Sequence, residues 1–260
     1  MQTGQGFSTK KVCSSIFQNS FADKIKCIIQ LYSNKAILKE GSIKARQVGP
    51  TKDIDMILIM EDNFPEFAAI FWEYIKEGGY KCGWKNEEDM HFYRFTEGKI
   101  GYPTMIELFS RKPGYHLEIE EGIISIHIDD DVSSLSAILL NDDFYNFMMS
   151  ERRVVDGIGV LGAEYLIPFK MYAWINLLDK KRVGEHVNEK DLKKHKYDVF
   201  RLLQIVTVGT KVESEGLVIE SIQRYIEEIS VLDESEVRLI QMGMPFDRDK
   251  GVELLKEIYL

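Results

Sequence analysis

The alternation of apolar and polar positions divides the chain into two parts, and the first part mixes helices with short strands. Apolar residues recur at helical spacing in Ser20–Tyr32 and in Phe64–Lys76, which predicts a helix over each segment. Apolar or alternating runs bounded by turn residues predict strands over Ala36–Leu38, Ile54–Met60, His91–Phe95, Thr104–Ser110, His116–Glu120 and Ile123–Ile128. The last two strands are expected to form a hairpin across Glu121-Gly122.

From Ala163 to the end of the chain the apolar period is helical. Helices are predicted over Ala163–Lys181, Asp191–Val208, Leu217–Ser230, Glu234–Met242 and Lys250–Tyr259. The change of period falls near Gly157–Gly162. The pattern therefore predicts an α+β protein, with a mixed β-sheet domain flanked by helices at residues 1–160 and an all-helical domain at residues 161–260.

Composition and charge restrict the classes of function. The 33 Lys and Arg against 42 Asp and Glu give a net charge of −9, which argues against broad, non-specific binding of nucleic acid. The segment Lys170–Arg201 differs, with nine basic against five acidic residues, so the rest of the chain carries −13. No uncharged apolar run reaches about 18 residues, which predicts no membrane span. Three separated cysteines and a polar start without a secretory pattern predict a cytoplasmic protein.

The strongest chemical signal is Gly41-Ser42 followed, after ten residues, by Asp53-Ile54-Asp55 at the start of an apolar strand. Two carboxylates at alternate positions of a strand share one face, close enough to hold a divalent cation, Mg²⁺ or Mn²⁺. A Gly-Ser turn lets backbone N–H groups and the Ser42 hydroxyl approach a phosphate. The combination favours binding of Mg²⁺ with a nucleoside triphosphate (NTP), the alternative being an exposed strand end.

This arrangement resembles the signature of the polymerase-β-like nucleotidyltransferase superfamily. Within it, the segments Thr51–Asp55, Lys170–Ala173 and Lys194–Phe200 resemble, in the same order, the AbiEii/AbiGii toxin family. The resemblance covers most of residues 30–208, but Gly49 stands where the family usually has an arginine. It implies a type IV toxin–antitoxin toxin that transfers a nucleoside monophosphate from NTP to an acceptor hydroxyl and releases pyrophosphate. It also implies tRNA as acceptor and a cognate antitoxin protein as partner.

The resemblance further implies the residues of the site. Asp53 and Asp55 would hold the metal with a third carboxylate on a neighbouring strand, for which we expect Glu107. Glu118 has the same local pattern, and either glutamate can simply face solvent from an alternating strand. The residues expected to bind the NTP phosphates are Gly41, Ser42, Lys44, Arg46, Thr51 and Lys170.

Lys170 lies on a helical face that is otherwise apolar, with Leu166, Ala173 and Leu177. A cation on such a face needs an anion. We expect Lys170 to be catalytic and to bind phosphate in a cleft between the domains, as the resemblance implies. The alternative is a structural lysine whose amine reaches water or pairs with Glu164.

Asp198 is the fourth expected catalytic residue, after Asp53, Asp55 and Lys170. The resemblance implies an essential role, either orienting Lys170 or accepting a proton from the acceptor hydroxyl. A surface ion pair with Lys194 or Arg201 on the same helix is the alternative. His195 shares a face with Val199, Leu202 and Val206, which predicts a half-buried structural histidine.

Other readings of the chain are weaker. Gly157–Gly162 fits the GxGxxG dinucleotide-binding pattern, but no parallel strand ending in an acidic residue follows, so the glycines are expected to form a hinge. The acidic pair also suits a small-molecule nucleotidyltransferase of the antibiotic-modifying type. A non-catalytic module that binds nucleotide is the remaining alternative.

Overall fold

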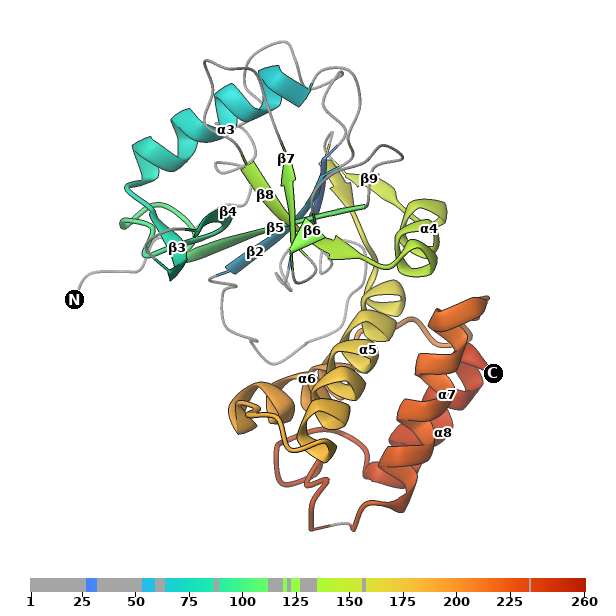
Figure 1. Cartoon of the computed structure of the whole chain (residues 1–260). Helices are drawn as coiled ribbons and strands as arrows, with labels where there is room; N and C mark the ends of the chain where they lie inside the picture. The colour runs from blue at the N-terminus through green and yellow to red at the C-terminus, as the bar shows by residue number, and fades with distance from the viewer. Residues whose placement is uncertain are drawn as a thin grey trace, which may run out of the picture. The chain divides into compact units, whose positions relative to one another are not determined.

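The computed structural model describes residues 27–31, 53–58, 64–86, 89–111, 119–120, 123–126, 135–155, 158–233 and 235–260. They form two compact units: a sheet unit, up to Asp142 together with Arg152–Leu161, and a helical unit, Asp143–Glu151 with Gly162–Leu260 (Figure 1). Helices and a mixed sheet occur together, which confirms the expected α+β composition. No helix in these ranges is both long enough and apolar enough to cross a membrane.

The sheet unit contains a helix and a mixed sheet. Its elements are β1 (Cys27–Leu31), β2 (Asp53–Leu58), α3 (Phe64–Gly78), β3 (Lys81–Asn86), β4 (Asp89–Thr96), β5 (Met105–Arg111), β6 (Ile119–Glu120), β7 (Ile123–Ile126), β8 (Leu135–Leu140), β9 (Arg153–Val155) and β10 (Ile158–Val160). The strands pair in the order β6-β7-β8-β5-β2-β1-β10-β9, and β4 pairs with both β3 and β5. Strand β5 is parallel to β2 and β8 but antiparallel to β4, so β2 and β5 are interior strands.

Helix α3 covers one face of the sheet. Its Phe71 and Trp72 meet Phe95 of β4 edge to face, with ring centroids 5.3 and 5.7 Å apart. Phe95 is the register partner of Ile106 on β5, and paired residues on neighbouring strands point to the same side. Both are fully buried. Glu107, which follows Ile106, therefore points to the face away from α3.

The helical unit packs around an aromatic core. Its helices are α4 (Asp142–Ser150), α5 (Ala163–Arg182), α6 (Glu189–Leu203), α7 (Gly216–Val231) and α8 (Arg248–Tyr259), the first residue of α4 belonging to the sheet unit. Trp174 of α5 meets the fully buried Tyr225 of α7 edge to face at 5.2 Å. The Tyr225 hydroxyl donates to the Lys196 carbonyl of α6 (2.9 Å), and the Tyr259 hydroxyl of α8 donates to the Glu164 carbonyl of α5 (2.5 Å). These bonds connect α7 to α6 and α8 to α5.

Helix α4 joins this unit through the first turn of α7. The Leu217 amide donates to Asp143 Oδ2 of α4 at 2.8 Å. The preceding Gly216 has φ +54°, a backbone conformation that side chains rarely adopt, and a Cβ there would lie 2.5 Å from Asp143 Oδ2. Glycine at this position therefore permits the close approach of α4 to the start of α7.

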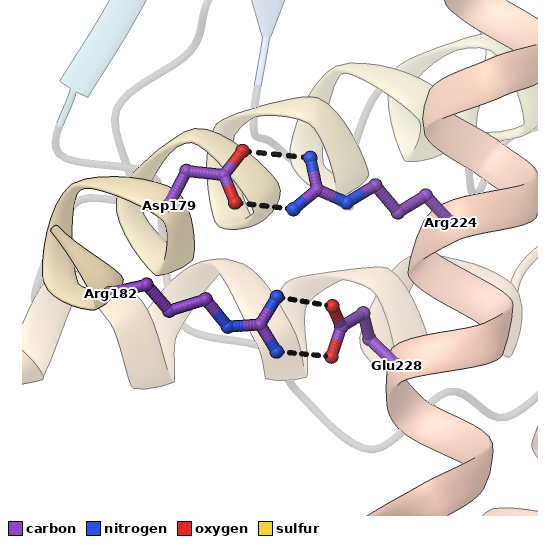
Figure 2. A network of polar contacts seen from close by, with 4 residues as sticks. All are labelled: Asp179, Arg182, Arg224 and Glu228. Carbon is purple, nitrogen blue, oxygen red and sulfur yellow. Dashed lines mark hydrogen bonds and ion pairs between the residues drawn. The ribbon is translucent and has the colours of Figure 1, made fainter.

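Two ion pairs connect α5 with α7 (Figure 2). Arg182 donates from Nη1 and Nη2 to the two oxygens of Glu228 at 2.6 and 2.8 Å. Arg224 donates from Nη1 to Asp179 Oδ2 at 2.7 Å and from Nη2 to Oδ1. Hydrogen bonds from the arginines lower the pKa of the Asp179 and Glu228 carboxyls. On each helix one member of these pairs is acidic and the other basic, so a shift of α7 along α5 would bring like charges together.

Most predicted elements occur in the structure, but Ser20–Tyr32 is not helical throughout. Residues Cys27–Leu31 form β1, which pairs antiparallel with β2 and parallel with β10. Its β-branched residues suit an interior strand, and a short apolar run fits either period. The helix predicted over Glu234–Met242 is also wrong, because the described residues there form turns, in which the Ser235 amide donates to Asp233 Oδ1 at 2.8 Å.

The glycine-rich segment Gly157–Gly162 contains strand β10, which is antiparallel to β9 and parallel to β1. Gly159 lies within that strand and does not form a turn from strand to helix. This agrees with rejection of the dinucleotide-binding pattern. The two units meet along the chain between Leu161 and Gly162.

Candidate functional site

A row of three charged residues crosses the interior strands of the sheet, on the face away from α3. We call Asp55 of β2, Glu107 of β5 and Arg94 of β4 the charged row. Asp55 and Glu107 are register partners on parallel strands, and Glu107 and Arg94 are partners on antiparallel strands. Adjacent strands lie about 4.8 Å apart. The two carboxylates therefore stand side by side.

The local sequence explains why these carboxylates share one face. Ile106 and Leu108, on either side of Glu107, are fully buried. Met56, next to Asp55, is the register partner of Leu108 and is also buried. Because side chains alternate along a strand, burial of these neighbours directs Asp55 and Glu107 to the opposite face. The period-two pattern of the sequence thus builds the acidic pair.

Arg94 compensates the charge of Glu107. Its Nε donates to Glu107 Oε1 at 2.7 Å, and its Nη2 lies 2.6 Å from the same oxygen. The Glu107 side chain is 14% exposed and that of Arg94 is 48% exposed. A poorly hydrated carboxylate is thus paired with a better hydrated cation.

The donor set of this face fits a hard divalent cation, which prefers carboxylate oxygens. Within the described ranges no group of three or more His, Cys, Asp or Glu is arranged to hold a metal ion. Asp55 and Glu107 supply two carboxylates, and a third would come from Asp53, the register partner of Met105 on β5. The side chain of Asp53 lies outside the described part, so its contribution stays a prediction from the sequence.

Several predicted site residues also lie outside the described ranges. They are Gly41, Ser42, Lys44, Arg46, Thr51 and Glu118. Their expected contacts with phosphate, or with metal in the case of Glu118, stay predictions. Glu107 is described and is the register partner of Asp55, and its role as third carboxylate also stays a prediction.

A second group of charges forms where α5 packs on α6 in the helical unit. We call Lys170 of α5 with His195 and Asp198 of α6 the lysine cluster. Burial lowers the pKa of Lys170 to about 8, while the Asp198 carboxylate acts to raise it and Lys194 to lower it. The residue keeps part of its surface exposed, so it is the amine that is poorly hydrated. Such an amine gains from a bound anion.

Asp198 interacts with charges on both helices. Its Oδ1 lies 2.7 Å from Arg201 Nη1, and the exposed fractions of the two side chains are 13% and 41%. The ion pair expected as the simpler alternative is therefore present. The Asp198 carboxylate also acts to raise the pKa of Lys170, so its charge influences the Lys170 amine on α5.

His195 is half-buried, as its apolar helix face predicts. Its burial, followed by the Lys170 charge, lowers the imidazole pKa to about 4, with Asp198 opposing and Lys194 reinforcing this shift. Within the described residues its buried Nδ1 has no hydrogen-bond partner. The sequence missed its proximity to Lys170, because that proximity depends on how α5 packs against α6.

The first turns of α6 present an exposed basic face. Lys190, Lys193 and Lys194 are exposed at spacings of three and four residues, which places them on one side of the helix. Lys196 differs, since its Nζ donates to the Glu236 carbonyl at 2.8 Å and burial lowers its pKa. The basic segment of the sequence thus separates into surface cations and one structural lysine.

Arg94 is the site residue that sequence reasoning missed. It lies within the predicted strand His91–Phe95, and a charged residue in such a strand was the available signal. Its partner Glu107 is 13 residues away on another strand, so the spacing alone does not reveal the pair.

Comparison of the chain with protein-family models, with curated proteins and with solved structures gives no match. The function is therefore inferred from the residues of the chain itself.

Proposed function

We propose that this chain is a Mg²⁺-dependent nucleotidyltransferase. It transfers a nucleoside monophosphate from NTP to an acceptor hydroxyl and releases pyrophosphate. The observation that carries the proposal is the register of Asp55 with Glu107 on two parallel interior strands. Asp53 and Asp55 lie on the same strand, so Glu107 is a third carboxylate next to the acidic pair of the sequence.

Asp53, Asp55 and Glu107 are the residues that would hold Mg²⁺, with Mn²⁺ as a substitute. When bound there, the metal would neutralise triphosphate charge and lower the pKa of the acceptor hydroxyl. The protein's own part is to hold the carboxylates on a rigid sheet, with Glu107 fixed by Arg94. Rigid positioning of ligands supports phosphoryl-group chemistry, which depends mainly on alignment and charge.

The lysine cluster is proposed to contribute a cation to the NTP phosphates. The Lys170 amine is poorly hydrated and carries a pKa of about 8, so at neutral pH it is mostly protonated and gains from an anion. Asp198 would orient this amine or accept the proton of the acceptor hydroxyl. The remaining phosphate contacts are assigned to Gly41, Ser42, Lys44, Arg46 and Thr51, on the basis of the sequence pattern alone.

The identity of the acceptor is proposed from the resemblance to the AbiEii/AbiGii toxin family. This resemblance makes the chain a type IV toxin, with tRNA as acceptor and an antitoxin protein as partner. The exposed Lys190, Lys193 and Lys194 support an anionic acceptor, because a basic face on an acidic protein attracts phosphate-rich polymers.

The proposal is tested by supplying donor and acceptor together. The purified chain is incubated with Mg²⁺ and each of the four NTPs labelled at the α-phosphate, with total tRNA or with a panel of aminoglycosides and lincosamides. The Asp55→Asn variant is the matched control, since it removes one carboxylate charge and keeps the side-chain volume. Label on tRNA that needs Mg²⁺ and Asp55 is the expected result.

Other outcomes separate the alternatives. Label on an antibiotic instead of tRNA would show a small-molecule nucleotidyltransferase. Binding of NTP without transfer to any acceptor would show a non-catalytic module. Transfer by Asp55→Asn at the wild-type rate would refute the metal-site assignment.

A further inference from the structure

We infer that Arg94 is a positioning residue for metal binding: it fixes the Glu107 carboxylate through one oxygen and leaves the other as the metal ligand. The inference rests on the proposed function, because it assigns a role at the same carboxylate site. It adds a residue that the sequence pattern does not contain.

The geometry of the ion pair supports this role. Arg94 directs both Nε and Nη2 to Oε1 of Glu107, at 2.7 and 2.6 Å, in place of the two-oxygen arrangement that the α5–α7 arginines make. Within the described part of the chain Oε2 therefore has no hydrogen-bond donor. A carboxylate held by one oxygen keeps a defined orientation and one oxygen available for a cation.

The position of the Arg94–Glu107 pair in the sheet also supports a positioning role. Glu107 lies between Arg94 and Asp55, as the register partner of each on opposite sides of β5. Arg94 orients the Glu107 carboxylate from one side, and the Asp55 carboxylate lies on the other side. Groups that hydrogen-bond to metal ligands in this way orient them, and their removal commonly lowers metal affinity by about 10-fold to 100-fold.

A purely structural ion pair makes a different prediction. Arg94 is about half exposed, but Glu107 is only 14% exposed, so loss of Arg94 leaves a poorly hydrated carboxylate without its cation and should lower the melting temperature in either case. A purely structural pair predicts this loss of stability with unchanged metal affinity of the folded protein, whereas a positioning residue predicts that metal affinity falls as well. These two readouts separate positioning from stabilisation.

The experiment measures Mn²⁺ binding to the full chain by the electron paramagnetic resonance signal of free Mn²⁺. For Arg94→Met we expect Mn²⁺ affinity to fall about tenfold or more, with partial recovery in Arg94→Lys. The control is Lys81→Met, which removes an exposed ion pair with Glu97 in the same unit and should leave the affinity unchanged. In a Glu107→Gln background, Arg94→Met should cause no further loss.

Each outcome decides one claim. Equal or tighter Mn²⁺ binding by Arg94→Met would overturn the inference, and tighter binding would show that Arg94 competes with the metal. If wild type binds no Mn²⁺, the proposed metal site fails, and this inference fails with it. If Arg94→Met does not fold, the Arg94 Nε–H resonance of wild type decides: retention of its protection from exchange on adding Mg²⁺ supports positioning, and loss of protection refutes it.

Discussion

The charged row of the sheet unit and the lysine cluster of the helical unit differ in the surroundings of their charged side chains. In the row, Arg94 contacts Glu107 directly, and Asp55 lies beside the same glutamate on the next strand. In the cluster, burial dominates, so the Lys170 pKa falls to about 8 in spite of the Asp198 carboxylate. The row therefore places two carboxylates beside one arginine, whereas in the cluster burial outweighs the effect of the Asp198 carboxylate on the pKa of Lys170.

The difference predicts different ligands for the two groups. Paired carboxylates on a sheet favour a cation, and a poorly hydrated amine favours an anion. Magnesium with a triphosphate contains both kinds of partner. Substitutions that alter one group while the other stays intact therefore test the comparison.

The largest effect is expected from Asp53→Asn together with Asp55→Asn. Turnover should fall by about a thousandfold or more, because the metal contribution to the transition state is several kcal/mol. The melting temperature without Mg²⁺ should hold or rise, since two like charges are removed. Rate measurements and thermal melts of the same preparations check both parts.

A volume-matched control for this variant is Asp142→Asn with Asp247→Asn, which neutralises two exposed or capping carboxylates outside the row. Turnover of that control should stay near wild type. Unchanged turnover in the Asp53/Asp55 variant would remove the charged row from the reaction.

Lys170→Met should have the next largest effect, and it should raise the stability of the folded chain. Lowering a lysine pKa from 10.5 to about 8 penalises the folded state, so the variant should gain about 1 to 3 kcal/mol in free energy of unfolding at pH 7. Between pH 8 and the ordinary lysine range the unfolded wild type binds more protons than the folded chain, so wild-type stability rises with pH there. The variant should lack this rise.

Nucleotide binding gives the second readout of Lys170→Met. Affinity should fall most for NTP, less for NDP and least for NMP, because the amine is proposed to bind phosphate. Lys180→Met, an exposed lysine on the same helix, is the control. An equal loss for all three nucleotides, or lower stability with normal binding, would make Lys170 structural.

Substitutions on the exposed basic face of α6 are expected to have a smaller effect, and on RNA modification only. Replacing Lys190, Lys193 and Lys194 by Gln should weaken RNA modification and reduce the slope of log affinity against log salt by about two to three, since fewer counterions are released. NTP affinity should change little. Lys196 is left intact because its amine donates a hydrogen bond to the Glu236 carbonyl.

The control for the basic face carries the same change of net charge at exposed lysines outside α6: Lys76, Lys250 and Lys256. Its salt slope should match that of wild type. If both triple variants reduce the slope equally, net charge and not this face governs RNA binding.

The smallest effect concerns the pairs between α5 and α7 (Figure 2). Arg224→Met should lower the free energy of unfolding by about 0.5 kcal/mol, because both side chains of the Asp179 pair are partly exposed, at 41% and 44%. Asp179 has a lowered pKa, so its contribution is present above the unfolded-state pKa and is lost as pH falls. Denaturant melts at neutral and acidic pH measure the difference, and no loss at neutral pH would show that the pair adds nothing.

The sequence predicts features with a local period and misses features set by distant pairing. Asp55 and Glu107 follow from alternation with buried neighbours, and Lys170 and Asp198 from helical spacing. Arg94 could not be assigned, because the register of β4 on β5 depends on contacts far apart in the chain. Strand β1 was predicted as helix for a related reason, since only its pairing with β2 and β10 selects the extended form.

The most direct test of nucleotidyl transfer follows both ends of the triphosphate in one reaction. An NTP labelled at the α-phosphate in one sample and at the γ-phosphate in another is incubated with Mg²⁺, total tRNA and wild-type chain or Asp55→Asn. The account predicts α-label on the acceptor and an equal amount of γ-label in pyrophosphate with wild type, and neither with Asp55→Asn. Transfer of γ-label to the acceptor, or α-label transfer that survives Asp55→Asn, would contradict it.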